Sequence, residues 1–532
     1  KITANSTIVG AKFEGADKKK HVITHYVSMD ILDETLTRVN ATIDIINKDY
    51  SGEISFDDVE KINNKTVCYN HKSIAKTNFL RIVVDSHYIE KIGVINDVDK
   101  VMNNSIVTLY KTDESTKKLL NKIGIDIYSS RIIDETTVLL TPDQLNLLKD
   151  KAPYIISMAT SDLSKLTKED FTFYSDECIT IPKPKNEPVI GVIDTMFDSN
   201  VYFSEWVDFK NMLSQDIELS SNDYIHGTAV TSIIVDGPKF NPTLDDGCGR
   251  FRVRHFGVAT AKEFSSFTVL RAIKEIVSSN RDIKVWNLSL GSKMEINQNF
   301  ISPEAAILDK IQYENDVIFI IAGTNKTKEH TGITAIGSPA DSINSLVVNS
   351  VNKNNEPATY SRVGPVLSFF TKPDISYYGG DKDEPIRVCT PLGESLVSGT
   401  SFAAPWITRK MAYLINVVGL SREVAKALLI DSATGWSKNQ SSLHLIGKGV
   451  VPIKIDDILK TPKDEIKFVI TGTSEMYDTY NYNLPVPVYK DKHPFIAKAT
   501  LCYFPCCARN QGVDYTNTEL DITFGRVNGN SI

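Results

Sequence analysis

Short apolar runs alternate with amphipathic segments through the middle of the chain, from about residue 186 to residue 433. Runs such as VIGVID and DVIFIIAG are apolar throughout, whereas HGTAVTSIIV and FTVLRAIKEIVSS carry apolar positions at helical spacing. Strands that are buried on both faces have continuous apolar runs of this kind, and helices then cover the two faces of a parallel sheet. The pattern predicts an α/β domain with a doubly wound, mostly parallel sheet over residues 188–435.

The region upstream divides into two parts and a linker. Residues 105–160 read as a strand, the helix STKKLLNKI, two strands in IYSSRIID and TTVLL, the helix TPDQLNLLKDK and a last strand, a split β-α-β pattern. Residues 1–104 mix strand-like and helical runs, so we predict an α+β region there, of unknown role. The linker, residues 161–187, ends in three prolines that favour an extended chain.

The last part of the chain, residues 436–532, has a different pattern. The runs EIKFVITGT, PFIAKATLCYF and TELDITFGRV are rich in strand-forming residues and are separated by turn residues. This spacing predicts a small β-rich antiparallel module.

Composition narrows the class of protein. Hydrophobic residues make up 42% of the chain and charged residues 23%, values typical of a folded globular protein. The formal net charge of -7 argues against a nucleic-acid partner. VIFIIAG is far shorter than the ~18 residues that a membrane helix needs, so we expect no membrane span. The chain begins at Lys1 without methionine, which leaves open a secretory signal removed earlier.

The cysteines favour a reducing compartment. There are seven, an odd number scattered through the chain, which fits the cytoplasm better than a disulfide framework. Cys502, Cys506 and Cys507 lack a paired C-x-x-C pattern, so we expect free thiols there rather than metal ligands.

Three polar residues follow or precede apolar runs in the central domain. Asp194 ends the run VIGVID, His226 begins the helix of HGTAVTSIIV, and Ser401 lies in SGTSFAAP. Taken singly, each has an ordinary structural explanation as a turn or helix-capping residue. Taken together, they supply a carboxylate, an imidazole and a hydroxyl in the chain order Asp, His, Ser, the set that a serine nucleophile requires.

The SGTSFAAP segment is the most specific of the three. A pattern G-T-S-x-A-x-P arises by chance in roughly one chain of this length in two thousand. Pro405 breaks a local rule, since a proline inside a helix removes a backbone hydrogen bond. We expect it near the first helical turn, where backbone donors lack helical partners, with the Ser401 backbone N–H and the helix dipole directed at a developing oxyanion.

These motifs resemble the subtilisin-like serine proteases, the subtilases, over about residues 186–433, and the Asp-His-Ser chain order itself is a known mark of that family. VWNLSLGS is similar to the family strand that lines the substrate groove. The resemblance implies a subtilisin-like fold in which Ser289, Leu290 and Gly291 pair with extended substrate. It also implies that Ala322 and Gly323 form the other wall of the primary side-chain pocket.

One departure concerns the oxyanion site. The family usually reads Ala-Gly-Asn at the asparagine that donates to the oxyanion, but this chain reads Ala322-Gly323-Thr324-Asn325. Either Asn325 reaches the site after a one-residue shift, or the Thr324 hydroxyl replaces it as a weaker donor. We favour Asn325.

The flanking parts carry weaker resemblances. Residues 105–160 resemble the propeptide domain of subtilases, with an ordinary docked α+β domain as the alternative; as a propeptide it would pack on the catalytic domain, and the linker would lie through the active-site groove. The C-terminal module resembles β-modules of a bacterial intracellular subtilase subgroup, which implies an AAA-class ATPase as a partner. Calcium is common in subtilases, but no acidic loop here is specific enough to assign a site.

The sequence therefore predicts a cytoplasmic serine endopeptidase that acts on protein or peptide substrates and needs no cofactor. One alternative is a latent or inactive subtilase fold with a regulatory role. A second is another serine hydrolase such as an esterase, against which the absence of a G-x-S-x-G motif around Ser401 counts.

Overall fold

A computed structural model describes most of the chain and divides it into two compact units, one of residues 1–161 with 510–513 and one of residues 162–509 with 514–532. The described residues are 7–14, 20–93, 103–162, 164–165, 171–173, 180–261, 263–327, 330, 332–435, 442–475, 479–484, 486–492, 495–508 and 514–525. Within these ranges, every helix is too short or too polar to cross a membrane.

The first unit begins with a hairpin and three helices. Strands β1 (Ile8–Glu14) and β2 (Lys20–His25) pair antiparallel, and they are followed by α1 (Met29–Asp49), α2 (Phe56–Asn63) and α3 (Lys76–Tyr88). The run FLRIVV lies in α3, where Phe79 is buried against α1 and α2 side chains. This part agrees with the mixed pattern of residues 1–104.

The rest of the first unit is a three-stranded antiparallel sheet with two helices. Its sheet order is β4-β3-β5. The capping box at the start of α5 is confirmed, since the Gln144 backbone N–H donates to Thr141 Oγ1 at 3.3 Å and Thr141 N–H to Gln144 Oε1 at 3.1 Å. The elements are β3 (Ser105–Leu109), α4 (Thr116–Ile123), β4 (Thr137–Leu140), α5 (Pro142–Lys151) and β5 (Ile156–Ser161).

The sequence predicts a strand in IYSSRIID, but the described residues show none there. The segment forms a 3₁₀ turn at Ser129–Arg131 instead. Asp134 explains the difference, because its Oδ1 accepts from the backbone N–H groups of Thr136 and Thr137 and holds a turn just before β4. A side chain that bonds to nearby backbone competes with a strand ladder.

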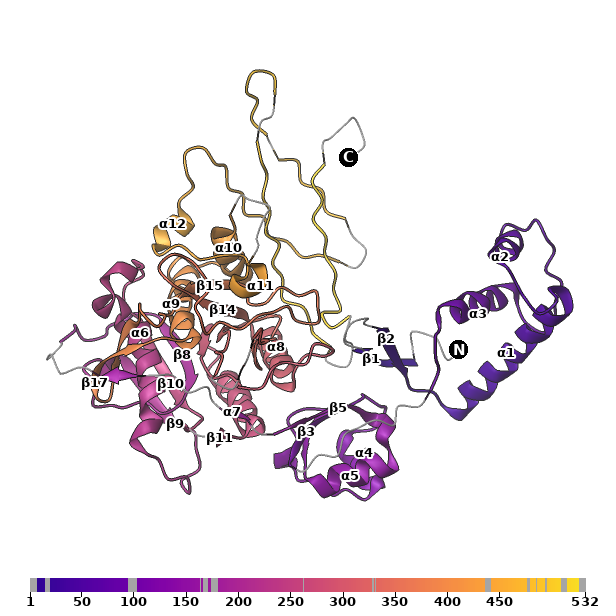
Figure 1. Cartoon of the computed structure of the whole chain (residues 1–532), viewed down its shortest axis with the longest axis horizontal. Helices are drawn as coiled ribbons and strands as arrows, with labels where there is room; N and C mark the ends of the chain where they lie inside the picture. The colour runs from indigo at the N-terminus through magenta and orange to yellow at the C-terminus, as the bar shows by residue number, and fades with distance from the viewer. Residues whose placement is uncertain are drawn as a thin grey trace. The chain divides into compact units, whose positions relative to one another are not determined.

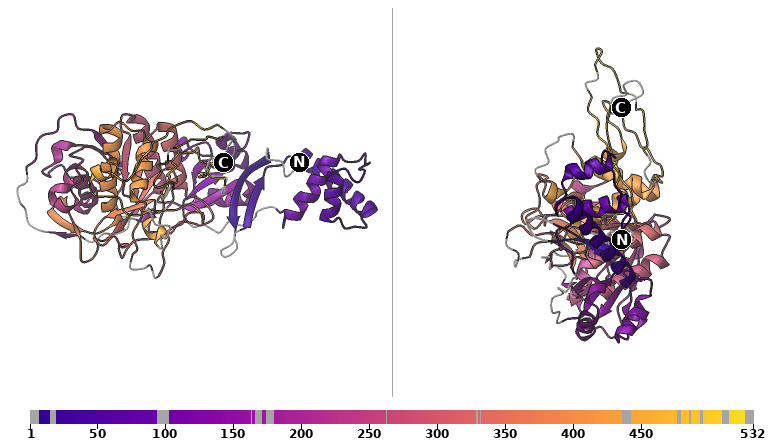
Figure 2. Two further views of the ribbon diagram at one scale, coloured as in Figure 1. Left: turned by 90° about the horizontal axis from the view of Figure 1, so that it is seen from above. Right: turned by 90° about the vertical axis from the view of Figure 1, so that its right-hand side faces the viewer.

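The second unit is built on a seven-stranded sheet in the order β15-β14-β13-β12-β8-β10-β9, in which every pairing is parallel. This confirms the α/β fold class, and Figures 1 and 2 show the helices that cover the sheet. The strands are β8 (Val189–Asp194), β9 (Val207–Asn211), β10 (Arg252–Gly257), β12 (Val285–Leu288), β13 (Ile318–Ala322), β14 (Leu346–Val351) and β15 (Ile375–Tyr378). The helices are α6 (Ile225–Phe240), α7 (Ser266–Ser279), α8 (Pro303–Asn315) and α9 (Thr400–Ala412).

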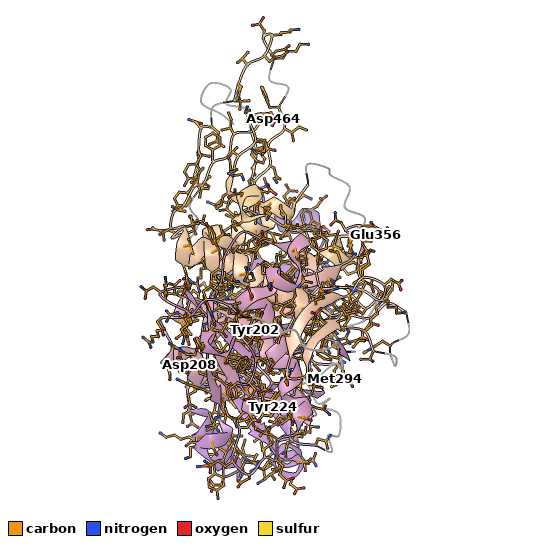
Figure 3. The ribbon with its side chains drawn as sticks, turned by 90° about the vertical axis from the view of Figure 1, so that its left-hand side faces the viewer. Tyr202, Asp208, Tyr224, Met294, Glu356 and Asp464 are labelled. Carbon is orange, nitrogen blue, oxygen red and sulfur yellow. The ribbon has the colours of Figure 1, made fainter. Side chains whose placement is uncertain are left out.

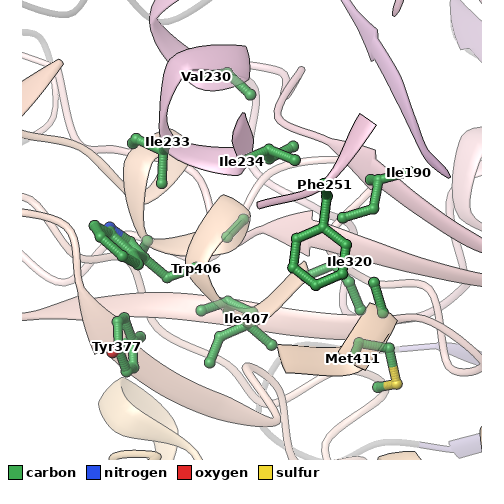
Figure 4. Close-up of a cluster of buried hydrophobic side chains, with 14 of the residues drawn as sticks. Ile190, Val230, Ile233, Ile234, Phe251, Ile320, Tyr377, Trp406, Ile407 and Met411 are labelled. Atoms are coloured by element: carbon green, nitrogen blue, oxygen red, sulfur yellow. The ribbon is translucent and has the colours of Figure 1, made fainter. Parts of the chain in front are cut away.

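Alternate residues of the central strands face opposite sides of the sheet. Ile318 and Ile320 of β13 belong to the buried cluster that contains Trp406 and Ile407 of α9, and Figure 4 shows part of that cluster. Phe319, between them, stacks on Trp286 of β12 with ring centroids 6.2 Å apart. Burial on both faces is the reason that these strands read as continuous apolar runs.

Short antiparallel pairs and further helices complete the second unit. Strands β16 (Ile386–Thr390) and β17 (Gly393–Val397) form a hairpin beside α6, and α10 (Arg422–Ala433), α11 (Leu443–Ile446) and α12 (Ile455–Leu459) follow α9. Three two-residue strands are β6 (Ser164–Lys165), β7 (Thr172–Phe173) and β11 (Glu263–Phe264).

The expected C-terminal module takes an extended form. After Leu459 the described residues have no helix or named strand, and one isolated bridge joins Tyr489 to Lys492. Tyr515 is nevertheless buried and donates from its hydroxyl to Asp309 of α8 at 2.6 Å. This last segment therefore packs on the sheet domain.

Candidate active site

Asp194 is placed by the end of the central strand β8. Its side chain is completely buried, and Oδ1 accepts from the Thr195 backbone N–H at 2.7 Å. The same oxygen lies 2.6 Å from Nδ1 of His226. Oδ2 has no hydrogen-bond partner within the described part of the chain. The carboxylate is thus held in one orientation, toward the imidazole.

His226 is the second residue of helix α6. The helix start packs directly on the chain that follows β8, because a methyl group added at Gly227 would lie 2.6 Å from the Met196 carbonyl oxygen. The Gly227 backbone N–H also donates to Thr195 Oγ1 at 2.9 Å. Glycine after the histidine is therefore what allows the imidazole to reach Asp194. Tyr224, labelled in Figure 3, comes just before this helix.

Ser401 is the second residue of helix α9, and its side chain is buried. The ring of Phe402, the next residue, lies 5.9 Å from the His226 ring, measured between centroids. The structure therefore brings the start of α9 beside the Asp194–His226 pair. Ser401 Oγ donates to the Ser289 carbonyl oxygen at 3.3 Å.

Pro405 lies one turn further into the helix than the sequence indicated. It is the sixth residue of α9, where an N–H would ordinarily donate to the carbonyl of Ser401. Proline has no such donor. The Ser289 hydroxyl donates to that carbonyl instead, at 3.1 Å, and itself accepts from Asn287 Nδ2 at 3.0 Å. The missing helical bond is thus replaced by a bond to the neighbouring strand end.

The side chains of Thr324 and Asn325 have different hydrogen-bond partners. Asn325 Oδ1 accepts from the Thr400 backbone N–H at 3.0 Å and from its hydroxyl at 2.9 Å. The Thr324 hydroxyl donates to the Gly323 carbonyl at 2.6 Å and accepts from the Gly337 N–H at 2.8 Å. The single hydroxyl proton of Thr324 is therefore engaged within its own loop, whereas Asn325 sits against the residue before Ser401.

Two walls flank the start of α9. Ser289, Leu290 and Gly291 continue from β12, and Ala322 and Gly323 lie at the end of β13, its parallel neighbour. Ser289 and Leu290 are almost fully buried. The residues expected to border a substrate groove thus share one edge of the sheet with Asp194 and Ser401.

The linker contacts the same edge on two sides. Ser164 and Lys165 pair antiparallel with Phe264 and Glu263, and Thr172 pairs with Leu396 of β17. The Phe171 ring meets the Phe402 ring edge-on, with centroids 6.0 Å apart.

Asp162, at the start of the linker, caps helix α7. Its Oδ1 accepts from the Phe267 backbone N–H at 2.9 Å, and its Oδ2 accepts from the Ser265 hydroxyl at 2.8 Å. Burial raises the pKa of this carboxyl, while the two hydrogen bonds lower it in part.

Sequence reasoning missed one residue of this region. Arg362 is fully buried and donates to carbonyl oxygens of Ser292 and Lys293 and to Thr324 Oγ1. Burial lowers its pKa to about 10. The signal that could have found it is the arginine in ATYSRVGP, a charged residue among small and apolar ones between Asn325 and Ser401.

The side chains of the described residues form no group of three or more histidine, cysteine, aspartate or glutamate residues that could hold a metal ion.

A family model described as the subtilase family matches residues 185–449. Among curated proteins, alkaline protease 1 of Aspergillus clavatus is 30% identical over 156 residues, which cover 29% of this chain and 34% of that protein. An uncharacterized protein of Sinorhizobium fredii is 24% identical over 225 residues, 32% of this chain and 52% of that protein. The chain thus spans about half the length of one of these relatives and a third of the other.

Two solved protease structures align with part of this chain. The epidermin leader peptide processing serine protease of Staphylococcus aureus, as a serine-to-alanine mutant, aligns over 66% of this chain and 98% of its own, with 17% identity and a TM-score of 0.48. The prenylagaramide maturation protease aligns over 51% and 92%, with 23% identity and a TM-score of 0.39. Through the family match over residues 185–449, the chain belongs to the subtilase family.

Proposed function

We propose that this chain is a serine endopeptidase in which Asp194, His226 and Ser401 form the catalytic triad. The observation that carries the proposal is the 2.6 Å contact between His226 Nδ1 and Asp194 Oδ1, next to the α9 start that bears Ser401. With Nδ1–H donated to the carboxylate, Nε2 is the nitrogen that can take a proton from Ser401 Oγ.

The reaction would run in two halves. Ser401 Oγ attacks the peptide carbonyl as His226 removes its proton, and Asp194 stabilises the imidazolium. His226 then gives that proton to the leaving amine, which leaves an acyl-enzyme. Water attacks the acyl group with His226 again as the base. The chemistry needs no cofactor.

Asn325 and the backbone N–H of Ser401 are the proposed oxyanion donors. The amide oxygen of Asn325 is fixed on Thr400, so the group of this side chain that can donate near Ser401 is the amide nitrogen. The Thr324 proton is used on Gly323. Asn325→Ala should therefore lower turnover about 10²–10³-fold. Thr324→Ala should have the smaller effect on turnover of a substrate that both variants cleave.

The proposed activity is tested by cleavage of an unfolded protein substrate, with Ser401→Ala as the matched control. We expect fragments from the parent chain and none from the variant. Equal cleavage by the two proteins would mean that another group, or a contaminant, performs the reaction.

We further propose that the linker restrains the site in cis. Its short strands pair with β11 on one side and β17 on the other, and Phe171 lies on the residue next to Ser401. The contact between Phe171 and Phe402 holds the linker beside Ser401, where a substrate carbonyl would have to lie. Phe171→Ala should raise the initial rate on a short peptide, and a rate unchanged or lower would argue against restraint.

A latent subtilase fold with a regulatory role is the second candidate, and the same linker contacts favour it. The two proposals differ in one measurement. If loosening the linker gives activity, the site is a restrained enzyme, and if it gives none while the fold is intact, the fold serves another role.

The remaining proposals concern the surroundings of the protein. The six cysteines in the described part of the chain are free thiols, which supports a cytoplasmic location. The AAA-class ATPase partner rests only on the resemblance of the C-terminal module, and its test is co-purification with the full chain.

A further inference from the structure

The family resemblance implies that the side chain preceding the cleaved bond lies between two chain segments at the ends of neighbouring strands. Strands β12 and β13 run parallel and adjacent, and beyond them the chain continues as residues 289–292 and 323–325. Both segments touch the start of α9, through Ser401 Oγ on the Ser289 carbonyl and Thr400 N–H on Asn325 Oδ1. By the resemblance to subtilases, the side chain of a peptide held at Ser401 would enter the slot between these segments.

The slot is narrowed by the methyl group of Thr324. A methyl group added at Gly291 would lie only 2.6 Å from Thr324 Cγ2. Thr324 Cγ2 thus already packs against the bare backbone of Gly291, and the two walls meet at this point. A long or aromatic side chain entering between them would have to displace the methyl group.

The methyl group is held in that position by the hydroxyl on the same carbon. Thr324 Oγ1 donates to the Gly323 carbonyl at 2.6 Å, and it accepts from the Gly337 N–H at 2.8 Å and from Arg362 Nη1 at 3.2 Å. Rotation about χ1 would break all three bonds. The side chain is 3% exposed, so water could not replace them.

The backbone of Thr324 is strained. Its φ of +68° lies in the left-handed region, which is a genuine outlier for a β-branched residue. Such strain persists only where the surrounding structure enforces it, and it gathers at functional sites. Glycine would adopt this conformation without strain.

Arg362 fixes the width of the slot because its guanidinium bonds to both walls. Its guanidinium donates to the Ser292 and Lys293 carbonyls on one wall and to Thr324 Oγ1 on the other. It is fully buried, and a methyl group added at Gly337 would come within 2.6 Å of its Nη1. The two walls are therefore tied together and cannot separate to admit a larger group.

From this arrangement we infer that Thr324 is a specificity-determining residue, which restricts the residue before the cleaved bond to a small side chain such as glycine, alanine or serine. The inference rests on the proposed peptidase function.

The test uses the full chain and peptide substrates that differ only at that position, with alanine, leucine or phenylalanine. The parent should prefer alanine over phenylalanine by about 10- to 100-fold in kcat/KM, the range over which a tight pocket discriminates. In Thr324→Gly the ratio of phenylalanine to alanine cleavage should rise at least about tenfold.

Two further variants separate the methyl group from the hydroxyl. Thr324→Ser keeps the hydroxyl and removes the methyl, so the leucine-to-alanine ratio should rise. Thr324→Val keeps a methyl group but loses the three hydrogen bonds. Its leucine-to-alanine ratio should therefore change less, relative to the parent, than the ratio of the serine variant does. The serine variant also keeps the test valid if the glycine variant folds poorly.

The outcomes separate this inference from the proposed function. A parent that prefers phenylalanine, or a Thr324→Gly variant that slows every substrate by the same factor, would overturn the inference and leave the peptidase function standing. A parent that cleaves none of the peptides and no unfolded protein would overturn both.

Discussion

The two ends of helix α9 differ in how well the polar groups around them are hydrogen-bonded. At the end that bears Ser401, Asp194 keeps a buried oxygen without a partner in the described part of the chain, Thr324 is strained and Pro405 has removed a helical bond. At the other end, Arg409 is completely buried, and its guanidinium forms two bonds to Asp246 and two more to backbone carbonyls. The strained residue and the unpaired carboxylate oxygen of this comparison thus lie at the end where chemistry is proposed.

At the second end, the charges of Arg409 and Asp246 balance each other. Burial alone would raise the pKa of the Asp246 carboxyl, but the Arg409 charge and hydrogen bonds outweigh burial and hold that pKa below its ordinary value. The side chain of Arg409 also lies over the rings of Phe251 and Trp406. This difference suggests that the satisfied end anchors the helix so that the strained end can hold Ser401 in one position.

The largest effect should follow from changing the strained end. Ser401→Ala should reduce peptide hydrolysis by about 10⁶-fold, and Asp194→Asn by about 10⁴-fold, the sizes of the corresponding effects in serine proteases. The thermal midpoint should hardly move, because neither change removes a packed side chain. Initial rates and circular dichroism melting measure the two quantities. A large loss of stability in Ser401→Ala would mean that this end also anchors the fold.

The satisfied end should show the reverse behaviour. Arg409→Met leaves Asp246 buried without its charge partner, which should cost about 3–5 kcal/mol of unfolding free energy in urea titrations. Activity per folded molecule should change far less. The double variant Arg409→Met/Asp246→Leu should recover most of the loss, since an apolar pair can replace a buried ion pair. A single variant that costs under about 1 kcal/mol would contradict the anchoring role.

Lys410, next to this pair, predicts a dependence on pH. Burial lowers its pKa to about 8 from an ordinary value of 10.5. Between these values the unfolded chain binds more protons than the folded one, so stability should rise with pH. The rise attributable to Lys410 is about 3 kcal/mol, and Lys410→Met should remove it. Urea unfolding at pH 7.5 and 10 compares the two proteins, and the same rise in both would exclude Lys410 as the source.

The smallest effect concerns the bond that replaces the helical hydrogen bond lost at Pro405. Ser289→Ala leaves the Ser401 carbonyl without its donor and should cost about 1–3 kcal/mol. In a Pro405→Ala background the restored N–H can donate to the same carbonyl, so the cost should fall by about 1 kcal/mol. A double-mutant cycle in urea measures this coupling. Strict additivity would mean that the two donors do not serve one acceptor.

Features that depend on short stretches of sequence could be predicted before the structure was known. The α/β class followed from continuous apolar runs, and Asp194, His226 and Ser401 followed from short motifs at strand ends and helix starts. The structure brings Asp194 and His226 into contact and places Phe402, the residue after Ser401, against the His226 ring.

Other features depend on contacts between distant segments. Arg362 bonds to residues about 70 positions earlier in the chain and to Thr324, which no local pattern shows. Likewise, the run IYSSRIID has the composition of a strand, but Asp134 turns the chain before β4. The choice between Thr324 and Asn325 needed the positions of Gly323 and Thr400.

The central claim is that Ser401 is an activated nucleophile. The most direct test is mass spectrometry of the parent chain and of Ser401→Ala after incubation with a fluorophosphonate probe, with the adduct mapped to a residue. We expect an adduct on Ser401 of the parent and none on the variant. No adduct on the parent, with Phe171→Ala also unlabelled, would contradict it.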